Sequence, residues 1–293
     1  MVKSNKMTEP KLSVRASGSG GRGYRHPVNG NVVPSVTTVL KNMNKPALIQ
    51  WAVDQTAAFA VANIDGLLSR TEEQGWGMLR WYWNRDPLKG EVDIRNFYNG
   101  VRDDAAELGT MIHEWIAADH GVGNYPDVSN APEFFWQMVT VWNEWLSQHE
   151  VEPVASEATV WSHQHGYAGT LDGIWVVDGV RYLVDVKSSR NIFDEHRMQL
   201  SALGAADALM VEVEPDKWID APMPEFDAYA ILHIRPQDSD KDGNVMQPYC
   251  RLEVLDKEEM PVHFEAFKGL LQVSEAQRGL KEMRKRIQET PEF

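Results

Sequence analysis

Two aspartates and a lysine fall on one face of a predicted β-hairpin, and side chains of these types can bind a divalent metal and activate water. Asp178-Gly179 is typical of a two-residue turn, and apolar runs flank it on both sides. The register set by this turn places Asp172 directly opposite Asp185, with Cβ atoms about 4.5–5.5 Å apart. Lys187 follows Asp185 by two residues and therefore points to the same face. The three side chains should meet at one place on the hairpin.

This acidic pair lies in an otherwise apolar hairpin and needs a compensating charge. Both faces of the hairpin are apolar, so we expect it to be central in its sheet. Two facing carboxylates are destabilising unless a cation or a proton lies between them. Mg²⁺ favours carboxylate oxygens and keeps waters that a nearby lysine can orient or deprotonate. The alternative, a buried Asp–Lys ion pair with the second aspartate protonated, leaves a charge unmatched, so we favour the metal.

Two further side chains are candidates for the same site. His113 lies off the apolar stripe of a predicted helix, and Gly109 one turn earlier leaves room for another element to approach. Glu157, on the strand before Asp172, could ligate a second metal or pair with a base, and an exposed strand glutamate is nearly as good an interpretation. Three other histidines near these elements stay unassigned, the first two being expected in solvent: His163, His165 and His196.

The elements that must position these residues follow from the hydrophobic pattern. Helices are predicted over 35–40, 46–68, 102–120, 132–149, 194–210 and 265–288, and strands over 157–162, 171–177, 180–188, 226–235 and 245–255. This order predicts an α/β or α+β protein with a core sheet inside a mostly helical frame. We expect a flexible basic arm (1–30), a helical region that includes the His113 helix (31–150) and the sheet with its flanking helices (151–293). Residues 31–293 should form one compact unit.

Composition excludes several classes of protein. The 293 residues are 43% hydrophobic and 25% charged, as in ordinary globular proteins, so a fibrous or wholly disordered chain is excluded. No apolar run suits a transmembrane helix, and residues 1–10 lack the apolar core of a secretory signal. Cys250 is the single cysteine, which excludes disulfides, four-cysteine zinc sites and iron–sulfur clusters within one chain. We therefore expect a cytoplasmic protein with no membrane partner.

The charge distribution leaves room for a nucleic-acid partner. A net charge of −14 by itself argues against one, because phosphate neutralisation needs Lys and Arg. Residues 1–25, however, carry six basic residues and one acidic residue. They could contact DNA, although a disordered tail is the favoured interpretation. The aromatic run from Trp76 to Trp83, with arginines beside it, suits base stacking but is more often part of a core.

The hairpin also resembles a known family. Gly169-Thr170-Leu171-Asp172-Gly173, a short hairpin and then Asp185-Val186-Lys187-Ser188-Ser189 resemble the PD-(D/E)XK nuclease superfamily. They are most similar to its RecB-like exonuclease branch, which includes the CRISPR-associated RecB-like exonucleases and many phage exonucleases. The segment from Gly109 to His113 resembles the Gly-x-x-x-His helix motif of that branch. The resemblance covers roughly residues 30 to 270, with the motifs in the family's order.

Further positions extend the resemblance, and two depart from it. Glu157 stands on a strand where the branch often carries a Glu, and Gln199 is similar to the start of its Gln-x-x-x-Tyr motif. Leu203 replaces the tyrosine of that motif, so this chain lacks the phenol. The CRISPR-associated relatives carry four cluster cysteines, and with Cys250 alone this chain is expected to hold no iron–sulfur cluster. The segments 34–40 and 45–48 resemble phage members as well.

The resemblance implies a restriction-endonuclease-like core with a central mixed β-sheet. It implies that His113, Asp172 and Asp185 bind Mg²⁺ or Mn²⁺, as one or two ions, and that the Val186 carbonyl completes the coordination. Lys187 would position the attacking water for in-line attack on phosphorus. The other candidates for the catalytic set and for DNA contacts are Glu157, Gln199, Arg190 and Arg197.

The implied function is that of a metal-dependent DNA exonuclease in phage or bacterial recombination, repair or replication. Its partners would be single- or double-stranded DNA ends and a recombination or replication protein, in the host cytoplasm if the chain is phage-encoded. A structure-selective or nicking endonuclease of the same fold is one alternative. A catalytically idle module that binds DNA ends or protein is another, against which the intact set of Asp172, Asp185 and Lys187 argues.

Overall fold

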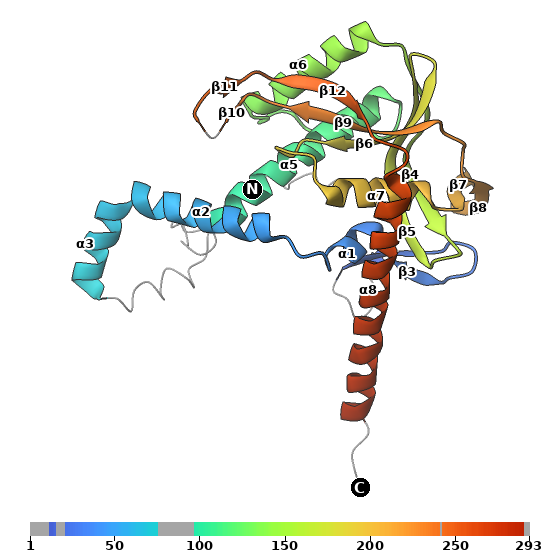
Figure 1. The fold of residues 1–293 in the computed structure, drawn as a ribbon, viewed down its shortest axis with the longest axis horizontal. Coiled ribbons are helices and arrows are strands. Elements are labelled where there is room, and N and C mark those ends of the chain that lie inside the picture. Colours follow the sequence, from blue (N-terminus) through green and yellow to red (C-terminus); the bar gives the residue numbers. More distant parts are fainter. Residues whose placement is uncertain (1–11, 16–20, 76–96, 241, 290–293) are drawn as a thin grey trace. The chain divides into compact units, whose positions relative to one another are not determined.

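The computed structural model describes residues 12–15, 21–75, 97–240 and 242–289. The predicted arm is therefore described only in part, and the aromatic run from Trp76 to Trp83 lies outside the described residues. The protein is a mixed α/β structure with a large mixed β-sheet flanked by helices, consistent with α+β (Figure 1). Among the described residues, no helix combines the length and the apolarity needed to cross a membrane.

The chain divides into two compact units. Residues 1–43 and 109–293 form one, called here the sheet unit, and residues 44–108 form the other, the helical unit. This division differs from the predicted boundaries at 30 and 150. In the structure, the boundary between residues 108 and 109 falls inside one long helix, α5 (Phe97–Asp119). The half of this helix that carries His113 therefore belongs to the sheet unit.

Seven strands form the main sheet, in the order β12-β9-β6-β5-β4-β7-β8. Their bounds are β4 (Val151–Ser162), β5 (Tyr167–Val177), β6 (Val180–Lys187), β7 (Ala208–Glu214), β8 (Lys217–Pro222), β9 (Ala228–Arg235) and β12 (Tyr249–Val254). Neighbouring strands are antiparallel except β6 and β9, which run parallel. The β5–β6 hairpin is therefore central in the sheet, as predicted from its apolar faces.

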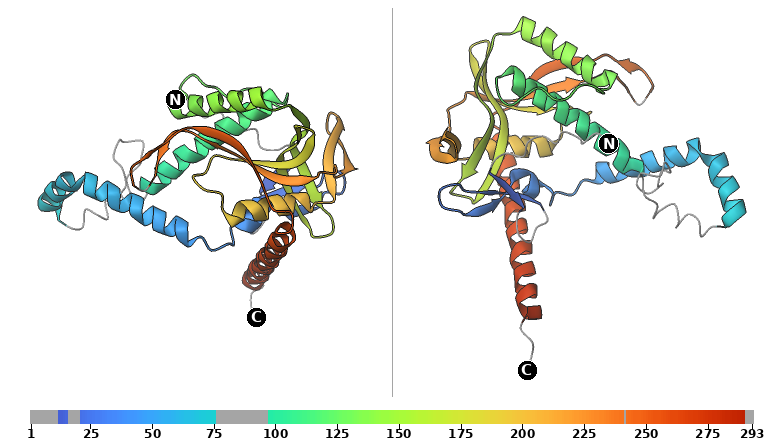
Figure 2. Two further views of the ribbon diagram at one scale, coloured as in Figure 1. Left: turned by 45° about the horizontal axis from the view of Figure 1, so that its top comes forward. Right: turned by 180° about the vertical axis from the view of Figure 1, so that it is seen from behind.

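Helices cover both faces of this sheet (Figure 2). The helices of the sheet unit besides α5 are α1 (Val36–Leu40), α6 (Glu133–Gln148), α7 (Asp194–Gly204) and α8 (Met260–Glu289). Ile174 and Leu183 point into a core shared with α1, α7 and α8. Trp175 points to the opposite face, where its ring lies 4.6 Å from that of His120, the residue after α5, and 6.3 Å from that of Trp142 on α6, centroid to centroid. This alternation buries both faces of the hairpin.

Local sequence signals account for several helix ends. Ser35 caps α1, because its side-chain oxygen accepts the backbone N–H of Thr38 at 3.0 Å, as its position before the helix predicts. In the helical unit the predicted helix over 46–68 is two helices, α2 (Pro46–Ala62) and α3 (Ile64–Gln74). Asn63 ends α2, with its backbone N–H bonded to the carbonyl of Phe59.

Several short strands were not predicted. A three-stranded sheet is formed by β1 (Ser13–Arg15), β2 (Arg22–Arg25) and β3 (Val32–Pro34). The strand β10 (Asp238–Ser239) was not predicted either, and it pairs with β11 (Val245–Met246), which together with β12 divides the single strand expected over 245–255. The β7–β8 hairpin begins where the helix over 194–210 was expected to continue. Residues 208–210 favour a helix by their types, but they form a strand because they pair with β4.

Candidate metal centre

The central hairpin has the predicted turn and register. Asp178 and Gly179 both have positive φ, 51° and 85°, as the two-residue turn requires. The ladder runs from Val177 opposite Val180 to Gly173 opposite Val184 and stops there. The next positions of this register are the two aspartates. The two strands thus stop exchanging main-chain bonds at the point where the acidic residues stand.

The carboxylate of Asp172 fills a main-chain role where the ladder ends. Its Oδ2 accepts the backbone N–H of Val186 at 2.7 Å. The same oxygen lies 3.5 Å from Nδ1 of His113, whose side chain is 20% exposed. Helix α5 therefore brings the predicted histidine to the predicted aspartate, and the bond to Val186 fixes the carboxylate between them.

Glu157 is the third member of this group. On β4 its neighbours Ser156 and Ala158 pair with Gly173 and Leu171, so Glu157 lies opposite Asp172. One ligand atom from each of His113, Glu157 and Asp172 lies within 4.8 Å of the others. A nitrogen and carboxylate oxygens at this spacing suit Mg²⁺ or Mn²⁺. Of the two interpretations that the sequence left open for Glu157, the surface position does not apply, because its side chain is partly buried.

The backbone of Glu157 is in an unusual conformation. Its φ is 49°, in the left-handed region, although it lies within a strand and is not a glycine. The other two non-glycine residues of the described chain with positive φ are Asp178 and Asp216, each at a turn between paired strands. Strain of this kind costs about 1–3 kcal/mol and concentrates at functional sites.

Charges in this group shift the pKa values of its members in different directions. Burial, followed by the negative charge of Asp172, raises the pKa of Glu157 to about 8. Burial favours the neutral form of Asp172, but the charge of His113 and its hydrogen bond outweigh that and hold the pKa of Asp172 below its ordinary value. Burial likewise opposes ionisation of His113, but Asp172 raises the pKa of the imidazole overall. These shifts indicate an Asp172–His113 ion pair beside a protonated Glu157. A divalent cation can take the place of the protons on His113 and Glu157.

Asp185 and Lys187 form a second, adjoining part of the site. Lys187 Nζ lies 2.5 Å from Oδ2 of Asp185, whose side chain is fully buried. Gln199 on α7 donates from Nε2 to the other oxygen, Oδ1, at 3.1 Å. Lys187 also donates to the Val186 carbonyl at 3.3 Å, the atom expected to complete a metal sphere. Gln199 therefore contacts the acid rather than the lysine.

Asp185 does not belong to the close group of His113, Glu157 and Asp172. Burial raises the pKa of Asp185 to about 6, opposed by Lys187 and reinforced by Asp172. Its Oδ2 is buried and already faces the Lys187 ammonium, so a metal ion bound there would share this oxygen with the lysine. The described residues therefore offer a ligand group of three, with a third carboxylate, that of Asp185, beside it.

Glycines allow the elements of the site to approach closely. A Cβ on Gly109 would lie 3.0 Å from the hydroxyl oxygen of Ser188, so α5 packs against the end of β6 there. This is the close approach that the glycine before His113 predicted. On β5, a Cβ on Gly169 would lie 2.6 Å from the side chain of Leu203, which is buried in the core. Leu203 therefore packs in the core against Gly169.

The two arginines suggested as DNA contacts already have protein partners. Arg190 lies 3.7 Å from Asp238 and also donates to the carbonyl of Ser239. Arg197 lies 3.6 Å from Asp194 within α7. Any contact of these guanidinium groups with phosphate must compete with these pairs.

A second histidine group was not foreseen in the sequence. His26 and His163 both direct Nε2 at Oδ2 of Asp220, at 3.2 and 2.9 Å. His26 Nδ1 accepts the backbone N–H groups of Val28 and Asn29, so the neutral ring carries its proton on Nε2 and donates it to Asp220. A metal ion at Nε2 would have to displace this proton, and moving it to Nδ1 would break both backbone bonds. We therefore interpret this group as a hydrogen-bonded link between β8 and the residues that follow β2 and β4.

Sequence reasoning also missed the residues that support the loop after Lys187. Three side chains contact this loop, and none of them belongs to a sequence motif: His233, Arg235 and Asp238. Only the parallel pairing of β6 with β9, in which Lys187 faces His233, brings them there.

Comparison with known protein families and with curated proteins finds no match for this chain.

Proposed function

We propose that this protein is a divalent-metal-dependent DNA exonuclease with a restriction-endonuclease-like core of the RecB-like PD-(D/E)XK type. One observation carries the proposal. Two central strands present Asp172 and the Asp185–Lys187 pair where their ladder ends, and His113 stands beside Asp172. The order of the motifs along the chain agrees with the family that the sequence resembles.

The residues present fit a hard divalent cation. His113, Glu157 and Asp172 offer one nitrogen and two carboxylate ligands, and Asp185 offers a buried carboxylate that is paired with Lys187. When bound, Mg²⁺ or Mn²⁺ supplies Lewis-acid stabilisation of phosphate charge and acidifies a bound water. Glu157, with its raised pKa, gives up its proton when it becomes a ligand.

The chain's own residues provide the rest of the chemistry. Asp185 and Asp172 raise the pKa of Lys187 above its ordinary value against the effect of burial, so its ammonium stays charged. A charged lysine can orient a water and stabilise negative charge on a phosphate, but it cannot take a proton. Gln199 holds the Asp185 carboxylate from the opposite side. The Val186 N–H keeps Asp172 turned toward His113.

The proposed substrate is DNA, and the proposed site of attack is the end of a DNA strand. The basic residues at 1–25 supply positive charge that the acidic remainder of the chain lacks. A structure-selective or nicking endonuclease would use the same residues, and an idle binding module would use none of them for chemistry. Dependence on a free DNA end separates the first two.

The test is digestion of end-labelled linear DNA and of closed circular DNA in Mg²⁺, Mn²⁺ or EDTA. We expect degradation of the linear DNA with metal and an intact circle. Cutting of the circle would make the protein an endonuclease, and no cleavage of either substrate would refute the enzyme. Asp172→Asn should be inactive. Asp178→Asn is the matched control, since Asp178 is an exposed aspartate at the turn of the same hairpin and asparagine tolerates positive φ.

A further inference from the structure

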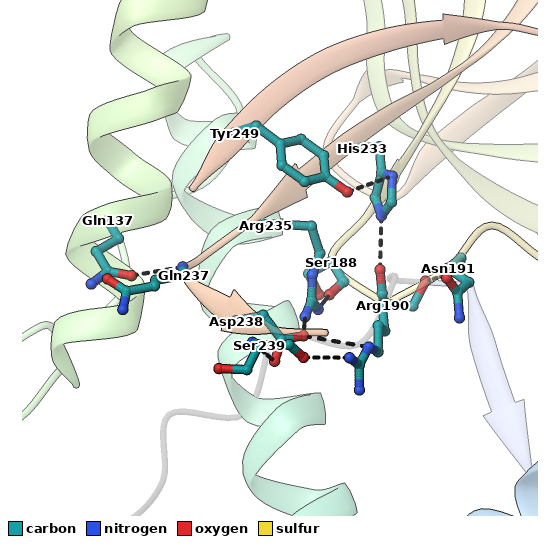
Figure 3. A network of polar contacts seen from close by, with 11 residues as sticks. Gln137, Ser188, Arg190, Asn191, His233, Arg235, Gln237, Asp238, Ser239 and Tyr249 are labelled. Atoms are coloured by element: carbon teal, nitrogen blue, oxygen red, sulfur yellow. Dashed lines mark hydrogen bonds and ion pairs between the residues drawn. The ribbon is translucent and has the colours of Figure 1, made fainter. Parts of the chain in front are cut away.

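The loop directly after Lys187 is held by side chains from β9 (Figure 3). His233 donates from Nε2 to the carbonyl of Ser189 at 2.8 Å. Arg235 donates from its guanidinium to the carbonyl of Ser188. Two successive carbonyls of the loop thus accept bonds from two side chains that point to the same face of one strand.

Asp238 completes this network from the other side. Its Oδ2 lies 2.7 Å from the guanidinium of Arg235 and 3.7 Å from Nε of Arg190. Arg190 belongs to the same loop and also donates to the Ser239 carbonyl (Figure 3). One carboxylate therefore ties the arginine of the strand to the arginine of the loop. Arg235 is 16% exposed, so its contacts are shielded from solvent.

Ser188, which Arg235 holds, touches both halves of the site. It follows Lys187 directly in the chain. Its hydroxyl oxygen lies against Gly109 of α5, and His113 is one turn further along that helix. Movement of Ser188 would disturb the lysine and the helix that carries the histidine together.

We propose that Arg235, held by Asp238, is a positioning residue that keeps Lys187 and His113 in place for catalysis. The inference rests on the proposed nuclease function. Arg235 acts through the Ser188 carbonyl and touches neither the ligand group nor Lys187 Nζ in the described contacts. Its loss should therefore lower kcat and leave the KM for DNA nearly unchanged. A misplacement of about 1 Å in a catalytic group can cost about a hundredfold in rate.

The experiment compares Arg235→Ala, Arg235→Lys and Asp238→Asn with the wild type on end-labelled linear DNA in Mn²⁺. The matched control is Arg181→Ala, which also removes a guanidinium bond to a backbone carbonyl, that of Glu225 at 3.2 Å, at the opposite end of β6 from Lys187. Amide hydrogen exchange at 186–191 and thermal unfolding are measured on every variant. Asp238→Asn keeps the test usable if Arg235→Ala does not fold, because it weakens the same link without emptying the arginine site.

We expect at least a tenfold fall in kcat for Arg235→Ala, a KM within twofold of wild type, and faster exchange at 186–191. Methylguanidinium, added in solution, should restore part of kcat, and methylammonium should not. An unchanged kcat, or a fall equal to that of Arg181→Ala, would overturn the proposal. A raised KM with unchanged kcat would overturn it too, because Arg235 would then bind DNA. An inactive wild type would instead refute the nuclease function. Unchanged amide hydrogen exchange at 186–191 in Arg235→Ala would separately show that Arg235 does not hold this loop in place.

Discussion

The backbone N–H of Val186 donates to the carboxylate of Asp172 at 2.7 Å. This bond joins β5 to β6 just beyond their last main-chain pair and turns an aspartate side chain into part of the sheet. Asp172 therefore serves the fold and the proposed metal site together, and different substitutions should separate these two roles.

Asp172→Asn should retain much of the stability that Asp172→Ala loses. The asparagine carbonyl can still accept the Val186 N–H, whereas alanine leaves a buried donor unpaired at a cost of about 1–3 kcal/mol. Both variants should lose Mn²⁺ binding and cleavage, because both lack the negative charge. Urea denaturation and a calorimetric Mn²⁺ titration measure the two effects. Wild-type Mn²⁺ affinity in Asp172→Asn would show that Asp172 is not a ligand.

Lys187→Ala should bind Mn²⁺ as well as the wild type or more tightly, yet cleave at least about a hundredfold more slowly. Removal of a cation beside carboxylates favours another cation. It also leaves the buried Asp185 unpaired, so the free energy of unfolding without metal should fall by about 3–5 kcal/mol.

The double variant Lys187→Ala/Asp185→Asn should recover stability but not activity, since position 185 then holds no unpaired charge. Lys217→Ala is the control, because Lys217 forms an exposed ion pair with Glu214. Normal cleavage by Lys187→Ala would place the catalytic site elsewhere.

Glu157 should make stability fall as pH rises. Its pKa is raised to about 8 in the folded protein, so the folded state binds this proton more tightly than the unfolded chain. The resulting stability is present below the ordinary glutamate pKa of about 4.3 and is lost as pH approaches 8. Glu157→Gln cannot ionise and should lose less stability over that range when measured by denaturation in EDTA.

Mn²⁺ should reverse this pH dependence, because it binds the carboxylate form and displaces the proton. Its affinity for the wild type should increase with pH up to about 8, and Glu157→Gln should show a smaller increase. Glu152→Gln, at an exposed position of the same strand, serves as the control. Identical pH profiles of wild type and Glu157→Gln would exclude Glu157 from the site.

The two histidine groups should differ in metal binding. His113→Ala should lower Mn²⁺ affinity at least tenfold, the order of effect expected for a weakened metal site. His163→Ala should leave Mn²⁺ affinity and stoichiometry unchanged, because the proton on His26 Nε2 makes that group a hydrogen-bonded link. Calorimetric titration of both variants with Mn²⁺ tests this difference. Loss of one bound equivalent of Mn²⁺ in His163→Ala would show that the second histidine group is also a metal site.

Short-range features of this protein were open to prediction because neighbouring residues decide them. The turn at Asp178-Gly179 needs two residues that accept positive φ, and both are adjacent in the chain. That turn sets the register, and the register sets which side chains share a face with Asp172. The cap at Ser35 and the glycine before His113 are local signals of the same kind.

Long-range pairing was not open to prediction. The strand β7 (208–214) pairs with β4 and with β8 (217–222), whereas residues 208–210 alone favoured a continued helix and no strand was predicted over 211–222. The three-stranded sheet at the start of the chain has strands of only three or four residues, too short for a periodic signal.

The sequence by itself determined the chemistry of the candidate site: which acids, which lysine and which histidine stand at motif spacing. Only the tertiary structure decided how they divide, with Glu157 joining His113 and Asp172 while Asp185 pairs with Lys187 and Gln199. It also decided that β6 runs beside β9, which brings Arg235 to the loop after Lys187. The reason is physical. Turns and caps depend on the backbone preferences of adjacent residues, whereas the partners of a buried charge depend on which distant strands and helices pack together.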